Sequence, residues 1–426
     1  MKRILSIVLS LLLVINAAVQ TTVSVAAETN PTDGDSEEQA YYVMDLQPVA
    51  EYQSRKISDH AEDSEPEAVV EKHAADEIVR VSVFLSSPSA LEKGYSTEGI
   101  AYNSKAVSYR QSLKKSQDNI TSKMEKKLGH SIDVVWNLTL AANAISINVP
   151  YGEIEAIKQI SGVESVELEV RYDPMDDINT AVTTKEMVYA SLAWNIGYTG
   201  AGSKVAIIDT GTNQDHLSFQ ADALEYSLTK DGGSLSDYDL LTVDNIAAVL
   251  NQLNAHSRSS SASASSFYKN TKIPYAYNYI DKNFTTDHDS DSQGEHGSHV
   301  SGIAAANRYV KVNGEFVDAA VTVGAVGVAP DAQILTMKVF GSGGGAYDSD
   351  YMAAIEDAIV LGADSANLSL GSGSSGWTFG SYETVMNKLV ENNTVVAMSS
   401  GNNGAWNDVP YSSNFPAEGY LYYGDV

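Results

Sequence analysis

Residues 204–211 read KVAIIDTG, and this apolar run indicates the fold of the chain. It has the length of a buried strand, is rich in β-branched residues, and ends in an aspartate and a glycine. Three later runs have the same character: AQILTMKVFG (332–341), SANLSLGS (365–372) and TVVAMSSGN (394–402). Helical patterns lie among them at 298–307, 348–363 and 382–393. Such alternation predicts an α/β fold with a parallel, doubly wound sheet covered on both faces.

Asp209 ends the first of these strands. In open α/β sheets ligands bind outside the carboxyl ends of the strands, so a carboxylate at this position is a candidate functional group. Asp followed by Thr and Gly is also a common turn and cap sequence. Taken alone, Asp209 is better explained as a turn residue.

The stretch GEHGSHVSG (294–302) contains two histidines, His296 and His299, at the start of a helix of small residues. The small residues, which include Gly297, Ser298, Gly302 and several alanines, predict close approach by another backbone. A zinc-binding HExxH motif has its histidines four apart with the glutamate between them, and neither condition holds here. The chain has no cysteine to complete a thiolate site. The pair therefore predicts one functional histidine and one packed histidine.

Asn402 follows the last apolar strand, within SSGNNG (399–404). An amide at a strand end can donate to a developing oxyanion. Asn-Gly pairs are also strong turn signals, so this residue has a structural alternative too.

Taken together, and in the order in which they occur along the chain, these stretches resemble the subtilisin-like serine peptidases over residues 180–426. VAIIDTGTNQDHLSF is similar to the aspartate motif of that family, and GEHGSHVSGIAAA is similar to its histidine motif. GVAPDAQILTMKVFG, NLSLGS and VVAMSSGNNG are similar to the segments that follow in the family. The long polar stretch between Asp209 and His296 is similar to the cell-envelope peptidases of the lactocepin and C5a-peptidase group.

The resemblance implies a role for each of these residues. His296 is expected to be the general base, Asp209 its orienting partner, and Asn402 the oxyanion donor. His299 is expected to be a packed structural residue. Two segments are expected to bind an extended substrate from opposite sides of a groove: Gly343, Gly344 and Gly345 on one side, and Ser369, Leu370 and Gly371 on the other.

Residues 77–172 carry a second pattern, in the order β-α-β-β-α-β. The strands are predicted at 80–87, 163–170 and twice within 131–150, and the helices at 104–129 and 152–163. This order predicts a ferredoxin-like α+β domain. It resembles the inhibitory propeptide of the same family, which implies cleavage near 170–185.

The remaining divisions follow from composition. Residues 1–27 have the basic start, apolar core and small-residue end of a secretory signal peptide, and 28–76 form an acidic, flexible linker. Residues 173–426 are assigned to the peptidase domain, with a polar insertion at about 220–290 whose Ser-rich part (257–266) is expected to be an exposed loop. A net charge of −28 argues against nucleic acid and anionic membrane surfaces as partners. No second apolar run long enough to span a membrane follows the signal peptide.

The family's catalytic serine motif is not found before Val426, so the sequence is expected to be the N-terminal fragment of a secreted endopeptidase precursor acting on proteins or peptides. Attachment to a cell wall through a region beyond Val426 is left open. A non-catalytic pseudopeptidase is the alternative, and a histidine-based metal hydrolase a remote one. No cofactor is required and no metal site is assigned. Calcium is left open without a site, because 287–295 (DHDSDSQGE) is expected to be a solvated acidic loop.

Overall fold

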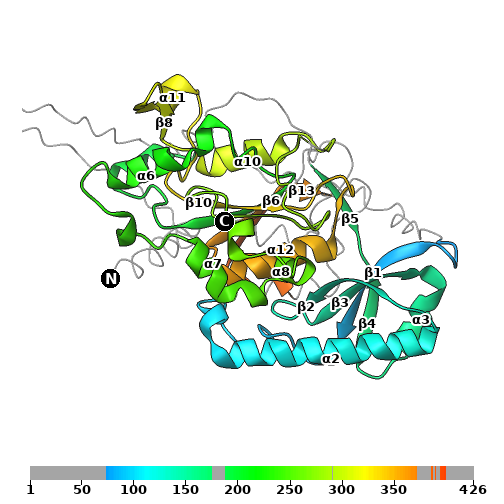
Figure 1. Ribbon diagram of the computed structural model, residues 1–426. Helices are drawn as coiled ribbons and strands as arrows, with labels where there is room; N and C mark the ends of the chain where they lie inside the picture. Colours follow the sequence, from blue (N-terminus) through cyan, green and yellow to red (C-terminus); the bar gives the residue numbers. More distant parts are fainter. Residues whose placement is uncertain are drawn as a thin grey trace, which may run out of the picture. The chain divides into compact units, whose positions relative to one another are not determined.

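The computed structural model describes residues 73–174, 188–289, 291–371, 385–386, 389 and 394–399 (Figure 1). The predicted signal peptide, nearly all of the predicted linker, and Asn402 lie outside these residues. Most of the predicted helix 382–393 and of the predicted cleavage region also lies outside them.

A five-stranded sheet forms the centre of the C-terminal subdomain, by which we mean the described residues from 188 onward. Its order is β14 (Val395–Met398), β12 (Ser365–Leu368), β6 (Lys204–Asp209), β10 (Gln333–Lys338) and β7 (Tyr275–Asn278). All four ladders are parallel. The sheet therefore confirms the predicted α/β class, and it extends the prediction by the edge strand β7.

Helices cover both faces of this sheet (Figure 1). On one face, Ile207 and Ile334 pack with Ala305 of α10 (His296–Ala305). On the other face, Ala206 and Ile208 join a core that includes residues of α12 (Asp348–Val360). Alternate residues of β6 thus face different helices, which explains why the strand is apolar throughout.

The N-terminal subdomain, residues 77–174, contains the predicted α+β arrangement. Its elements are β1 (Ile78–Leu85), α2 (Ser104–Leu128), β2 (Asp133–Leu138), β3 (Ala144–Pro150), α3 (Ile154–Lys158) and β4 (Val163–Leu168). The antiparallel sheet has the order β2-β3-β1-β4, and α2 lies across it in Figure 1. The second helix is shorter than predicted, because residues 151–153 form a 3₁₀ turn (η2, Tyr151–Glu153) and the α-helix ends at Lys158.

A further strand, β5 (Arg171–Pro174), links the two subdomains. It is the middle strand of a three-stranded antiparallel sheet, between β11 (Ala346–Tyr347) and β13 (Leu370–Gly371). The end of the N-terminal subdomain therefore pairs with two segments of the C-terminal subdomain that are far apart in sequence.

The expectation of an exposed loop at 257–266 holds only in part: five of these ten residues are exposed and only Ala264 is buried, but both ends of the segment are helical. The insertion contains α6 (Ala221–Thr229), α7 (Val243–Val249), α8 (Asn254–Arg258) and α9 (Ala264–Phe267), with short 3₁₀ turns η3 (Leu217–Phe219), η4 (Leu235–Asp237) and η5 (Leu250–Gln252). Phe267 is fully buried and stacks on Tyr275, with ring centroids 5.5 Å apart. This aromatic contact holds the Ser-rich segment against the sheet, because a buried ring contributes more than the solvation of small serines.

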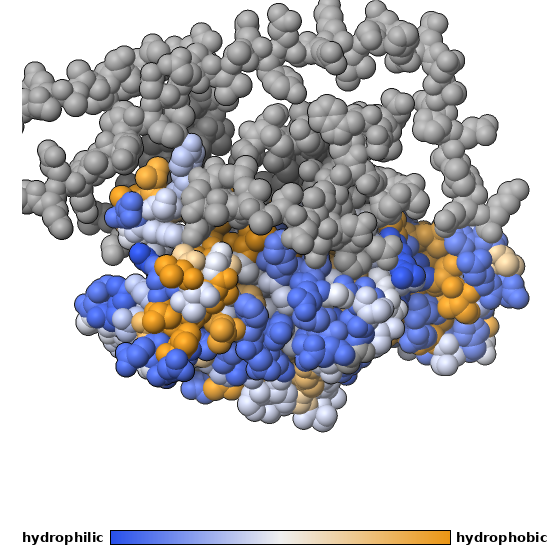
Figure 2. Space-filling model, turned by 90° about the horizontal axis from the view of Figure 1, so that it is seen from above, coloured by the Kyte–Doolittle hydropathy of each residue, from blue (hydrophilic) through white to orange (hydrophobic). Residues whose placement is uncertain are grey.

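The other described elements are α5 (Ala190–Asn195), η1 (Ile100–Tyr102), the hairpin β8 (Tyr309–Val312) and β9 (Glu315–Asp318), and α11 (Ala319–Thr322). Large apolar side chains reach the surface singly or in small groups, for example Leu192 and Ile196 near α5, and Figure 2 shows apolar patches among polar ones on one face. Such side chains are ordinary at protein surfaces, and we assign no site to them. None of the helices in the described ranges is long and apolar enough to cross a membrane.

Candidate active site

Asp209 and His296 meet at the carboxyl edge of the central sheet. Asp209 is the last residue of β6 and is fully buried, and His296 is the first residue of α10, with 12% of its side chain exposed. The Nδ1 atom of His296 lies 2.7 Å from Oδ1 of Asp209. The strand end and the helix start thus bring together two of the residues that the sequence singled out.

The loop after β6 is fastened to the start of α10. The backbone N–H of Gly297 donates to Oγ1 of Thr210 at 2.8 Å, and the N–H of Asn213 donates to Oγ of Ser298 at 2.8 Å. A Cβ atom at Gly297 would lie only 2.2 Å from the carbonyl oxygen of Gly211. The predicted close approach at Gly297 is therefore present, and only glycine allows it.

The environment of Asp209 determines the tautomer of His296. Burial raises the pKa of the Asp209 carboxyl, and the hydrogen bonds from His296 and Thr210 lower it again in part. An ionised carboxylate only accepts hydrogen bonds, so Nδ1 of His296 is assigned as the donor. The lone pair then lies on Nε2, on the side of the ring away from Asp209. This arrangement suits a general base whose ring is oriented by a buried carboxylate.

A buried ion pair next to Asp209 was not predicted. Lys338 is the last residue of β10 and lies beside Asp209 in the parallel register. Its ammonium group lies 2.9 Å from the carboxylate of Asp291 and donates to the carbonyl oxygen of Thr210. The side chains of Lys338 and Asp291 are 0% and 3% exposed, so the expectation that this acidic loop is solvated is wrong for Asp291. A lysine is almost never fully buried unless it is paired, so Lys338 at the end of a buried strand was the signal that an acidic partner existed.

Two other expectations for α10 are also wrong. The side chain of His299 is exposed rather than packed in a core. Gly302 has no neighbour within 4 Å of where a Cβ atom would lie, so it serves no close backbone approach. In a helix of 3.6 residues per turn, residues three apart point in different directions. His296 therefore contacts Asp209 at the end of β6, whereas His299 is exposed.

One side of the predicted groove is held by Asp281, which sequence reasoning missed. Its carboxylate accepts from the backbone N–H groups of Gly343 at 2.8 Å and Ser342 at 3.0 Å. Burial opposes ionisation of Asp281, but these bonds outweigh it, and its pKa lies below the usual value. Gly344 has a φ of +101°, and a Cβ atom there would lie 3.1 Å from the guanidinium of Arg171.

The strand that pairs with β5 on this side begins just after the predicted glycines. It is β11, where Ala346 pairs with Tyr172, so pairing starts one residue beyond Gly345. On the other side, Leu370 and Gly371 form β13 and pair with Pro174 and Asp173.

Ser369 lies just before β13, and its hydroxyl accepts a hydrogen bond from the side chain of Asn367 at 2.9 Å. Asn402 lies outside the described residues, so the structure does not place the predicted oxyanion donor.

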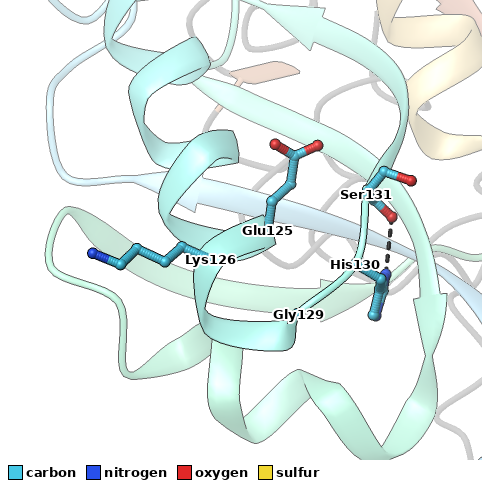
Figure 3. Close-up of a pocket in the computed structure, with 5 residues that line it drawn as sticks. All are labelled: Glu125, Lys126, Gly129, His130 and Ser131. Atoms are coloured by element: carbon cyan, nitrogen blue, oxygen red, sulfur yellow. Dashed lines mark hydrogen bonds between the residues drawn. The ribbon is translucent and has the colours of Figure 1, made fainter.

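A surface pocket lies elsewhere, at the C-terminal end of α2 (Figure 3). It is lined by Glu125, Lys126, Gly129, His130 and Ser131. His130 is bonded to the backbone of Ser131 and to Glu153, at 2.9 Å each, so this histidine is part of a surface hydrogen-bond network. The pocket shares no residue with the Asp209–His296 pair and is not the candidate active site. Within the described ranges, no group of three or more His, Cys, Asp or Glu side chains could hold a metal ion.

Comparisons with known proteins found similar sequences. Residues 200–421, just over half of the chain, match the family model described as Peptidase S8, subtilase family. A PI-type proteinase of Lactococcus lactis subsp. cremoris is 33% identical over 306 residues, which is 70% of this chain but 14% of that proteinase. The minor extracellular protease Vpr of Bacillus subtilis (strain 168) is 28% identical over 274 residues, 62% of this chain and 27% of that protein.

A solved structure of fervidolysin from Fervidobacterium pennivorans, a keratinolytic enzyme related to subtilisin, is also similar. The match covers 78% of this chain and 41% of the fervidolysin chain, with a TM-score of 0.45 and 16% identity. The chain thus spans a small part of the length of the lactococcal relative and less than half of this structure.

Proposed function

This chain belongs to the subtilase family, and on that premise we propose that it is the N-terminal part of a secreted serine endopeptidase precursor. The precursor hydrolyses peptide bonds of protein substrates by acyl transfer to a serine. Asp209 and His296 supply two members of the triad, and Asn402 supplies the oxyanion donor. The nucleophile is a serine that follows Val426 in the natural product.

The observation that carries this proposal is the 2.7 Å contact between Nδ1 of His296 and the buried Asp209. The contact orients Nε2 of His296, which takes the proton of the serine hydroxyl as that oxygen attacks the scissile carbonyl. The same nitrogen returns the proton to the leaving amine, and Asp209 stabilises the imidazolium between the two steps.

The position of β5 supports a second part of the proposal, that residues 77–172 are an intramolecular inhibitor. An extended peptide binds a groove by adding a strand between its walls. Here β5, at the end of the N-terminal subdomain, occupies the space between β11 and β13. The precursor therefore holds its own chain where a substrate strand would lie, with Gly343 to Gly345 and Ser369 to Gly371 at the edges of the groove.

The proposal also places the protein outside the cell. Residues 1–27 have the pattern of a secretory signal peptide. With a net charge of −28 and no cysteine, the chain suits a soluble exported protein that needs no disulfide. Extracellular proteins and peptides are then the natural substrates.

A fluorophosphonate probe tests the catalytic proposal, because it reacts only with an activated serine. The experiment uses the full natural product after removal of the N-terminal subdomain, and compares the wild type with His296→Ala and His299→Ala. The two histidines lie on one helix, three residues apart, but only His296 contacts Asp209. Labelling should be lost in His296→Ala and retained in His299→Ala.

The mapped label should lie on a serine beyond Val426. Equal labelling of the two variants would contradict the role of His296. A full-length product that binds peptides in the groove but takes up no probe would be a pseudopeptidase, and the catalytic proposal would be wrong.

A further inference from the structure

Trp136 of the N-terminal subdomain is the largest of its fully buried side chains, and it faces the C-terminal subdomain. It lies in β2, whose register with β3 shifts between Val134 and Trp136. Without that bulge, neighbouring residues of the strand would face opposite sides of the sheet. With it, Val135 and Trp136 both join the core that includes α12, whereas Val134 packs on the other side, toward α2 and α3. The bulge therefore aims the indole at the other subdomain.

In the C-terminal subdomain, a hydrogen-bond acceptor and an aromatic ring contact the indole. The indole Nε1–H donates to Oδ1 of Asp350 at 2.7 Å, and both side chains are buried. The ring of Tyr279 lies 5.9 Å from the indole, centroid to centroid, at an angle of 45°. Asp350 also pairs with Arg80 of the N-terminal subdomain at 3.1 Å. The carboxylate thus accepts hydrogen bonds from two side chains of the N-terminal subdomain, the indole of Trp136 and the guanidinium of Arg80.

Two cations complete the surroundings of the indole. The guanidinium of Arg258 and the ammonium of Lys282 lie 5.5 and 5.6 Å from the ring of Trp136. Nε and Nη2 of Arg258 are buried and have no hydrogen-bond partner among the described residues, and burial lowers the pKa of both cations. Lys282 is held at a φ of +53°, a strained conformation for a residue with a side chain. A desolvated cation is costly unless it is compensated, and the face of an indole is the best aromatic partner for one.

We propose that Asp350, Tyr279, Arg258 and Lys282 form a recognition site for an indole, and that its natural occupant is Trp136. We call these four residues the indole site. It selects the chain's own N-terminal subdomain and retains that subdomain after the connection between the two is cut. This inference rests on the proposed inhibitory role of residues 77–172 and adds the feature that makes the inhibitor specific.

The chemistry of the indole site explains why other aromatic residues would bind it poorly. A phenylalanine fills much of the volume but leaves Asp350 without its donor. A tyrosine carries its hydroxyl at the end of the ring, not at the position of the indole N–H. Loss of a hydrogen bond to a buried carboxylate, with weaker cation–π contact, corresponds to roughly 10- to 100-fold weaker association.

The test compares Trp136→Phe with Trp194→Phe in the full-length precursor. Trp194 is a matched control, because its indole also donates a hydrogen bond, to Val328, and also lies near an arginine, yet within the C-terminal subdomain. Amide hydrogen exchange of β2 and α12, read by mass spectrometry, reports separation of the subdomains without relying on peptidase activity. Exchange should become roughly 10- to 100-fold faster in Trp136→Phe and stay unchanged in Trp194→Phe.

A second pair of variants leaves the N-terminal subdomain untouched. Arg258→Met should accelerate the same exchange, whereas Arg308→Met, next to Trp194, should not. The effects of Trp136→Phe and Arg258→Met should be less than multiplicative when combined, because both remove the same contact.

The outcomes separate this inference from the proposed function. If Trp136→Phe and Arg258→Met exchange no faster than their controls, the indole site is wrong. If exchange rises but the onset of peptidase activity after processing is unchanged, the indole site stands and the inhibitory role is wrong. If exchange rises and activity appears earlier, both stand.

Discussion

Removal of the Glu356 carboxylate should loosen the N-terminal subdomain from α12. Glu356 is fully buried in α12. Its Oε1 accepts from the backbone N–H groups of Leu140 at 2.7 Å and Ala141 at 2.8 Å. Its Oε2 accepts from the N–H of Thr139 at 3.3 Å and from the side chain of Asn254 at 3.2 Å. One carboxylate therefore satisfies the turn between β2 and β3.

The size of the effect follows from these contacts. A hydrogen bond to a charged group contributes about 1.5–3 kcal/mol, and a buried donor left without a partner costs about 1–3 kcal/mol. The two short bonds dominate, so Glu356→Ala should weaken the association by about 3–5 kcal/mol, roughly 10²- to 10³-fold or more. Glu356→Gln keeps one acceptor oxygen but places an amide N–H₂ against other donors, so it should lose about half as much.

Hydrogen exchange of the amides at 139–142 in the full-length precursor measures this directly. The matched control is Glu155→Ala in α3, where an exposed glutamate pairs with Lys158 at 2.7 Å. Exposed pairs of this kind contribute little, so the control should exchange like the wild type. If the amides at 139–142 exchanged as slowly in Glu356→Ala as in Glu155→Ala, the Glu356 carboxylate would not be what holds the turn.

Three further predictions concern the site and its supports. Gly297→Ala should displace α10 from β6 and lower the rate of fluorophosphonate labelling at least about 100-fold, whereas Gly302→Ala, which meets nothing within 4 Å, should label normally. Lys338→Met should lower the free energy of unfolding by about 3–5 kcal/mol in urea titration, because it leaves the buried Asp291 charge unpaired. Burial raises the pKa of Asp348 from 3.8 to about 7, so this group favours folding at low pH and loses that contribution as the pH rises to about 7. Between about pH 4 and about pH 7, the melting temperature of the wild type should therefore fall relative to that of Asp348→Asn.

Each of these has a contrary result. Equal labelling of the two glycine variants would show that α10 tolerates the added methyl group. Full stability in Lys338→Met, or no recovery when Asp291→Asn is added to it, would show that the ion pair is not the cause. A melting-temperature difference that stays constant with pH would show that Asp348 does not take up a proton on folding.

The strands and helices next to the candidate site were predictable because their signals are local. Apolar runs of strand length ending in Asp209 or Lys338 appear in the sequence itself, and so does the small-residue helix after His296. The meeting of Asp209 and His296 was expected only through the family resemblance, since the residues alone favoured a turn role for Asp209; the structure brings them together at one edge of the sheet.

The insertion shows where local signals fail. A run of serines predicted an exposed loop, but the buried Phe267 that follows it packs on Tyr275 of an edge strand that the pattern did not reveal. Asp291 looked solvated for a similar reason, because its partner Lys338 is far along the chain. Both errors concern contacts between distant segments, which composition does not encode.

The acids of α12 could not be interpreted from the sequence either. A helix with four carboxylates is expected to expose a polar face, yet every residue of α12 is buried. Three of these carboxylates, Asp348, Asp350 and Glu356, are matched by donors from the N-terminal subdomain. Their burial is therefore a property of the two subdomains together rather than of the helix.

The interface between the subdomains also contains apolar residues, but its three buried carboxylates suit an association that is made once and later broken. When buried, each of the three carboxylates needs the donors of the N-terminal subdomain, because an unpaired buried charge is costly. When the subdomains separate, water can replace those donors, so the same groups are well solvated. The carboxylates thereby reduce the apolar area that separation exposes, and with it the tendency to aggregate. If residues 77–172 act as the proposed inhibitor, the acids of α12 hold it closely and leave polar groups on the surface that its release exposes. The indole site then supplies the specificity that carboxylates bound to backbone N–H groups do not.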